Sequence, residues 1–217
     1  KRLARDEQFA FYANAYNAWT IKLILTEYPD IKSIRELGFL NSGPWKKKVV
    51  QLKNEAVSLD HIEHDILRPR FKDPRVHFAI NCAAKSCPPL KSEPFRADIL
   101  NQQLDDATRS FLNNPTSYKL EGNSFYVSKI FKWFAEDFNP DVLSFYLKYA
   151  KAGVDQYMHP HIDQHHQPDS CIVGYTRWFN PTEFVVSGIG GYAAGKLATP
   201  GYTGTGVINP YEYFADD

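Results

Sequence analysis

The chain has no excess of charge of either sign, since 25 Lys and Arg residues balance 25 Asp and Glu residues. Nucleic-acid binders depend mainly on cationic contacts to phosphates, so we expect no nucleic-acid partner. The chain also lacks an apolar run near the roughly 18 residues that span a bilayer, so we expect no membrane span. Its three cysteines, Cys82, Cys87 and Cys171, are too few for a disulfide framework.

The chain begins with Lys1 rather than Met and shows no apolar signal region. We therefore expect that the native N-terminus is missing, so that the absence of a signal or transit segment is uninformative. What the chain does contain is apolar: 43% of its residues are hydrophobic, with 15 Phe, 13 Tyr and 4 Trp. This content is sufficient for a folded core.

Glycine is scarce in the first part of the chain and common in the last. Residues 1–150 contain three of the 12 glycines, and residues 151–217 contain nine. The charge changes at the same point, from 22 basic and 18 acidic residues to 3 and 7. These shifts predict a compact domain over 1–150, followed by an extended, irregular tail over 151–217 that is rich in glycine and aromatic residues.

Several helices are predicted in the first part. Helical spacing of apolar residues indicates a long buried helix over about 4–28, ended by Pro29. A second helix is expected after an N-cap at Ser58, with Pro69 as its stop. A third is expected over about 97–112, and two short helices, capped by Ser128 and Asn139, close the domain.

Short strands are predicted between these helices. The apolar run 76–80 has the composition of a buried strand, and residues 118–120 and 125–127 flank a hairpin signal. Residues 185–186 and 207–208 are candidates for short strands in the tail. Helices around a small sheet indicate an α+β fold.

Three histidines and two cysteines, His61, His64, His77, Cys82 and Cys87, occur within 27 residues. Cys82 follows the predicted strand that carries His77, so an imidazole within reach could hold it as a thiolate that attacks a carbonyl or a disulfide. Lys85 would favour the thiolate further. The alternatives are a packed, inert cysteine and a core histidine. His61 and His64 could share a metal with a cysteine, but a solvated helix face is the preferred interpretation.

Several motifs together resemble the domain-of-unknown-function 547 family. They are FYANAYNA at 11–18, SLDHIEH at 58–64, DPRVHFAINC at 73–82 and SCPPL at 86–90, followed by SKIFKW at 128–133 and DF at 137–138. The resemblance covers about residues 4–150 and implies no settled activity. It implies a set of polar signature positions: Glu63, His64, His77, Asn81, Cys82 and Cys87.

The long helix followed by a histidine-bearing strand is also similar to the papain- and transglutaminase-like group. Enzymes of that group place their cysteine at the start of the helix, whereas the helix of this chain offers Asn14 and Asn17 instead. The resemblance implies either that the nucleophile has moved to Cys82 or that the fold is kept without the chemistry.

Two features of the tail imitate known sites. Residues 184–193 mimic a dinucleotide fingerprint, but the 24 residues that follow leave no room for the second strand of a βαβ unit, so we expect no cofactor. A histidine cluster lies in a polar loop, and we expect an exposed linker there rather than a metal site. Its members are His159, His161, His165 and His166.

The sequence predicts two functions from different classes. In the first, the chain is a subunit of a larger assembly, because the tail has more aromatic side chains than a solvated linker needs and must bury them, on a partner protein in this hypothesis. In the alternative, the chain is a thiol-dependent enzyme: a cysteine hydrolase, an acyl transferase or a thiol–disulfide oxidoreductase. Cys82 would then be the nucleophile and His77 its base, with Glu63 or His64 orienting His77 and Asn81 polarising the carbonyl. The redox variant would use Cys82 with Cys87. The subunit is preferred because the family resemblance does not explain the tail.

Overall fold

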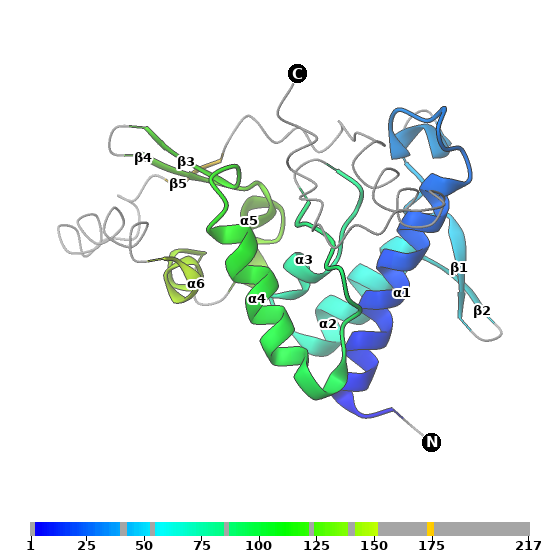
Figure 1. Cartoon of the computed structure of the whole chain (residues 1–217), viewed down its shortest axis with the longest axis horizontal. Coiled ribbons are helices and arrows are strands. Elements are labelled where there is room, and N and C mark those ends of the chain that lie inside the picture. Colours follow the sequence, from blue (N-terminus) through cyan, green and yellow to red (C-terminus); the bar gives the residue numbers. More distant parts are fainter. Residues whose placement is uncertain are drawn as a thin grey trace, which may run out of the picture.

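The protein is helix-rich with two small sheets (Figure 1), which confirms the predicted α+β class. The computed structural model describes residues 3–39, 43–52, 55–84, 87–121, 124–138, 142–151 and 173–175. In Figure 1 the long helix α1 (Arg5–Leu25) and helix α4 (Leu100–Leu112) stand on either side of the short helices α2 (Arg68–Phe71) and α3 (Val76–Ala79). The shorter helical elements are η1 (Ile34–Leu37), η3 (His61–Leu67), η4 (Ala97–Ile99), α5 (Ile130–Trp133), η5 (Ala135–Asp137) and α6 (Val142–Tyr149).

Helix α1 confirms the predicted long helix but buries one face rather than every side. Phe9, Ala13, Tyr16 and Ile24 are buried at helical spacing, whereas Phe11 is 46% exposed. This buried stripe of α1 packs against η3 and the β1–β2 hairpin, so α1 forms one side of the core cluster that these elements share.

The predicted N-cap at Ser58 is confirmed, because its Oγ accepts a hydrogen bond of 3.0 Å from the backbone N–H of His61. The predicted stop at Pro69 is wrong, since the helix continues to Phe71 through η3 and α2. Element η3 is a π-helix, in which the N–H of Arg68 bonds to the carbonyl five residues back at Glu63. Pro69 lies just after the junction of η3 and α2, inside this continuous helix, where it removes one backbone donor.

The predicted strand over 76–80 is also wrong, because residues 76–79 form helix α3. Asp73 Oδ1 accepts from the N–H of Arg75 at 3.0 Å, and Pro74 follows it, which is a helix-start pattern. The helix lies between two core clusters, with Val76 in one and Phe78 in the other. A short segment buried on all sides has no polar face, so its periodicity cannot separate strand from helix.

The first sheet is an antiparallel hairpin of β1 (Lys48–Leu52) and β2 (Glu55–Ser58). In the second sheet, β3 (Tyr118–Glu121) and β4 (Ser124–Val127) form the predicted antiparallel hairpin. A third strand, β5 (Val173–Tyr175), was not predicted and pairs in parallel with β4. Three residues of the predicted tail therefore extend a sheet of the first part of the chain.

The core consists of two main clusters. One joins α1, the β1–β2 hairpin and η3, and the other is an aromatic cluster built from α3, α4, α5 and α6. In the aromatic cluster, Phe131 is fully buried, with its ring centroid 4.6 Å from that of Phe138 and 5.9 Å from that of Tyr146. Helix α5 starts where Ser128 Oγ accepts from the N–H of Ile130, at 3.3 Å.

Several predictions fall on residues outside the described part of the chain. These are Lys85, Asn139, Cys171, the histidine cluster at 159–166, the fingerprint mimic at 184–193 and the strand candidates at 185–186 and 207–208. The domain boundary near residue 150 stays a prediction. Within the described residues, none of the helices combines the length and the hydrophobicity that a membrane crossing requires.

Candidate functional site

A pocket of about 540 Å³ opens among α1, η3, α3 and α5. Five of the six predicted site residues contribute to its walls, although they come from three separate segments of the chain. These five are Glu63, His64, His77, Cys82 and Cys87. The sixth, Asn81, is not part of the pocket wall. The sequence therefore locates the pocket, and the contacts of each residue define what it can do there.

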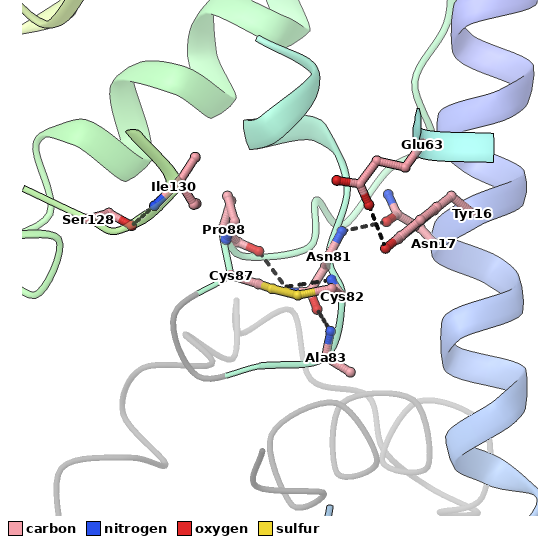
Figure 2. Close-up of a disulfide and its surroundings, with 10 residues drawn as sticks. All are labelled: Tyr16, Asn17, Glu63, Asn81, Cys82, Ala83, Cys87, Pro88, Ser128 and Ile130. Atoms are coloured by element: carbon pink, nitrogen blue, oxygen red, sulfur yellow. Dashed lines mark hydrogen bonds between the residues drawn. A yellow bond between two sulfur atoms is a disulfide. The ribbon is translucent and has the colours of Figure 1, made fainter. Parts of the chain in front are cut away.

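Asn81 is a structural clamp, so the predicted role in polarising a carbonyl has no support in its contacts. Figure 2 shows its side-chain N–H donating to the Pro88 carbonyl, at 2.7 Å, and its Oδ1 accepting from the N–H of Ala83, also at 2.7 Å. Its own backbone N–H donates to Asn17 Oδ1 at 2.9 Å. Asn81 is buried, and its side chain is fully used in shaping the loop that carries Cys82 and Cys87.

The two asparagines of α1 act in the same way. Asn17 accepts from Asn81 and donates to the Ala79 carbonyl, at 2.9 Å, so it fastens the end of α3 to α1. Asn14 exchanges two hydrogen bonds of 2.8 Å with the backbone of Phe95. An asparagine side chain can accept from a backbone N–H and donate to a backbone carbonyl at the same time. Asn14 and Asn17 therefore connect α1 to the backbone of other segments.

His77 is the central polar group of the pocket. The residue is 4% exposed, its ring stacks on Phe134 at a centroid distance of 4.1 Å, and its Nε2 lies 2.7 Å from Asp137 Oδ2. An ionised carboxylate only accepts, so Nε2 carries the proton and donates. The other nitrogen, Nδ1, has no hydrogen-bond partner among the described residues and is free to accept a proton. A carboxylate-held imidazole of this kind is suited to general base catalysis.

Asp137 is held ionised by its neighbours. Partial burial opposes its charged form, but hydrogen bonds from His77 and Arg68, together with their charges, outweigh burial and lower the pKa of Asp137 to about 2. Arg68 Nε donates to Asp137 Oδ2 at 2.6 Å, and its guanidinium lies 4.7 Å from the centroid of the Phe134 ring. Arg68 also forms a salt bridge with Glu136, so this arginine pairs with two neighbouring carboxylates, one of which holds His77.

The lowered pKa of Asp137 predicts an acid-dependent contribution to stability. A carboxyl group with a lower pKa in the folded protein stabilises it above its unfolded pKa of about 3.9, and the effect is lost as the pH falls toward about 2. Because the side chain is 22% exposed, solvent screening reduces the expected contribution to about 1–2 kcal/mol. We expect Asp137→Asn to lower the free energy of unfolding by this amount near neutral pH, and the difference from wild type to narrow below about pH 4.

Urea unfolding of both proteins across this pH range measures the difference. Asp65→Asn is the matched control, because Asp65 is exposed and pairs only with His61 at the surface. If the difference in free energy of unfolding between Asp137→Asn and wild type stays constant with pH, the charge of this carboxylate does not stabilise the fold.

Glu63 and His64 do not orient His77, contrary to the prediction. Glu63 Oε2 accepts from the buried hydroxyl of Tyr16 at 3.1 Å (Figure 2), and burial together with this carboxylate raises the pKa of Tyr16 well above its ordinary value. His64 Nδ1 lies 3.0 Å from Arg68 Nη1. Since a guanidinium only donates, Nδ1 is the acceptor and the proton of neutral His64 is on Nε2, which lies 3.6 Å from Asp60.

Cys82 and Cys87 are joined by a disulfide at the pocket (Figure 2). Cys82 is half-buried, whereas Cys87 is 9% exposed and its sulfur accepts from the N–H of Cys82 at 3.2 Å. A disulfide sulfur is not a nucleophile, so thiolate chemistry here requires reduction first. After reduction, Cys82 is the more accessible of the two thiols.

Metal binding has no geometric support in the described part of the chain, which contains no group of three or more His, Cys, Asp or Glu residues placed to hold an ion. His61 Nδ1 lies 2.7 Å from Asp65 Oδ2, and His61 does not line the pocket.

Sequence reasoning missed three residues of the site: Tyr16, Arg68 and Asp137. Asp137 lies 60 residues from His77 along the chain, so no local pattern joins them. The available signal was the pair Asp137-Phe138 in the closing motif, because a carboxylate in such a motif is a candidate partner for a histidine. Phe138 itself packs near the His77 ring, at a centroid distance of 5.6 Å.

The fold and the site define a helix-rich α+β domain with a polar pocket at its centre. Residues 1–112, just over half of the 217, match the family described as "Protein of unknown function, DUF547", and the chain belongs to this family. The match confirms the family resemblance over residues 1–112, and neither residues 113–150, which contain the closing motifs, nor the tail is covered by it. Neither the curated proteins nor the solved structures contain a match to this chain, so the papain- or transglutaminase-like resemblance is not confirmed.

Proposed function

We propose that the chain is a thiol-dependent acyl-transfer enzyme, a hydrolase or an acyl transferase, with Cys82 as nucleophile and His77 as base. The observation that carries the proposal is that one pocket is lined by both a cysteine and a histidine whose Nε2 is held by an ionised carboxylate. Asp137 takes the orienting role that the sequence assigned to Glu63 or His64. This arrangement of nucleophile, base and orienting group recurs in covalent catalysis on unrelated folds.

The chemistry would run after a thiol reductant, itself oxidised to a disulfide, has converted the Cys82–Cys87 disulfide to two thiols. His77 Nδ1 takes the proton of the Cys82 thiol, and the thiolate attacks the carbonyl carbon of an acyl substrate. The bond to the leaving group then breaks, the leaving group receives the proton from His77, and the acyl group remains on Cys82 as a thioester. Water or an acceptor nucleophile, deprotonated by His77, releases the acyl group. Asp137 stabilises the imidazolium that forms in each half of the cycle.

The first test is the rate at which iodoacetamide alkylates each cysteine of the folded, reduced protein, measured by mass spectrometry from about pH 5 to about 9. We expect Cys82 to react faster than Cys87, with a midpoint well below the ordinary thiol pKa of about 8.5. If Cys82 reacts only after denaturation, or with a midpoint near 8.5, it is a packed cysteine and the proposal is wrong.

The predicted subunit role is a second candidate, supported by the aromatic content of the tail, residues 151–217. Limited proteolysis of the isolated protein tests it, because a segment that requires a partner should be cut in the partner's absence. A tail that stays uncut would contradict this role. The aromatic side chains concerned are Trp178, Phe179, Phe184, Tyr192, Tyr202, Tyr211, Tyr213 and Phe214.

A further inference from the structure

The acidic and basic side chains of the pocket differ in their partners. Glu63 accepts a hydrogen bond from Tyr16, and Asp60 lies 3.6 Å from His64 Nε2. Arg35 and Lys46 also line the pocket, and within the described residues neither of them pairs with a carboxylate. Each of these two carboxylates therefore lies near a neutral hydrogen-bond donor, whereas the two cations have no anionic partner among the described residues.

The same wall contains two N–H donors without an acceptor. Arg35 Nε and Trp45 Nε1 are buried and make no hydrogen bond to the described residues, and both residues line the pocket. In the described part of the chain only one other buried side-chain atom is unpaired, Ser117 Oγ, and it is not part of the pocket wall. Buried donors are nearly always paired in folded proteins, so two orphans on one wall point to an acceptor that enters the pocket.

The backbone fixes the position of this wall. Ser33 Oγ accepts from the N–H of Arg35 at 3.3 Å, and the Arg35 carbonyl accepts from the N–H groups of Gly38, at 3.0 Å, and Gly43, at 3.2 Å. Gly43 has a φ of +79°, a conformation that favours glycine. This turn brings Trp45 and Lys46 back beside Arg35, so the unpaired donors and charges are grouped by the fold rather than scattered over a surface.

We infer that the pocket selects an acyl substrate that carries a carboxylate, which binds to Arg35 with Lys46 and Trp45 beside it. The inference rests on the proposed function for the acyl chemistry and adds the substrate class. A guanidinium suits this role because its planar fork can bind both oxygens of a carboxylate at once. Trp45 Nε1, the other unpaired donor of this wall, is the candidate for a further hydrogen bond to the ligand.

Two thiol reagents of nearly equal size test the inference without a known substrate. Iodoacetate carries a carboxylate beside its reactive carbon, and iodoacetamide is its neutral counterpart. In the reduced protein we expect Arg35→Gln to lower the iodoacetate-to-iodoacetamide ratio of rate constants at Cys82 by roughly fivefold, because one nearby positive charge is removed. Any loss of thiolate stabilisation slows both reagents alike and cancels in the ratio, and Arg35→Lys should retain part of the ratio.

Arg70→Gln is the matched control, because Arg70 is exposed and does not line the pocket, so this variant should keep the wild-type ratio. A ratio that Arg35→Gln leaves unchanged, with Cys82 still reactive, would overturn the carboxylate inference and leave the proposed function standing. A Cys82 that reacts with neither reagent in the folded, reduced protein would overturn both.

Discussion

In the reduced protein, His77→Gln should slow the alkylation of Cys82 by iodoacetamide about tenfold near pH 6.5. If His77 lowers the pKa of the Cys82 thiol by about two units, its loss reduces the thiolate fraction at this pH by roughly fiftyfold. A thiolate of higher pKa is also the stronger nucleophile, with a Brønsted slope of about 0.4–0.5, and this effect returns part of the loss. The two effects together give the expected net decrease in alkylation rate of about tenfold.

The effect should be specific to the histidine that shares the pocket with the thiol. His61→Gln is the control, because His61 lies on the same π-helix as Glu63 but does not line the pocket, so its rate should equal that of wild type. Asp137→Asn should slow the reaction in the same direction, since it removes the group that orients His77. Equal rates for His77→Gln and wild type would show that no imidazole activates Cys82.

Phe131→Ala should lower the free energy of unfolding by about 3–5 kcal/mol, the usual cost of removing a buried aromatic ring. Phe131 is fully buried, and its ring contacts those of Phe138 and Tyr146 in the aromatic cluster. It also lies on α5, one turn before Phe134, which stacks on His77. We therefore expect the variant to lose alkylation selectivity at Cys82 as well as stability.

Phe11→Ala provides the same chemical change at a surface position, because Phe11 is 46% exposed on α1. Its cost should stay within about 1 kcal/mol. Urea unfolding of the wild type, Phe131→Ala and Phe11→Ala measures the loss of unfolding free energy in each variant. Similar losses for the two variants would mean that the aromatic cluster does not form the core described above.

Local signals in the sequence were sufficient for the elements that are stabilised locally. The repeat of apolar residues located α1, the hydroxyl of Ser58 located the start of the helix that leads into η3, and the hairpin signal in the sequence at 121–123 located β3 and β4. The same reasoning failed at α3, where burial on every side hid the helical period. The start pattern at Asp73 and Pro74 was the correct signal there, and the strand prediction did not use it.

The sequence predicted most of the residues that line the pocket, but it did not predict which side chains they contact. Glu63, His64, His77, Cys82 and Cys87 reach the same pocket, as their shared signature suggested. Which of them orients His77 depends on packing between segments far apart in the sequence, and the answer is Asp137. Asn81 was selected as one of the family's polar signature positions, but its side-chain nitrogen and oxygen both bond to the backbone.

The most direct test of the catalytic proposal is to mix the reduced protein with p-nitrophenyl acetate and to locate the acetyl group by mass spectrometry. We predict an acetyl thioester on Cys82 that forms within the first turnover, disappears with time, and is absent from Cys82→Ser and much slower to form in His77→Gln. Acetylation confined to lysine side chains, with Cys82 unmodified in the folded, reduced protein, would contradict the account.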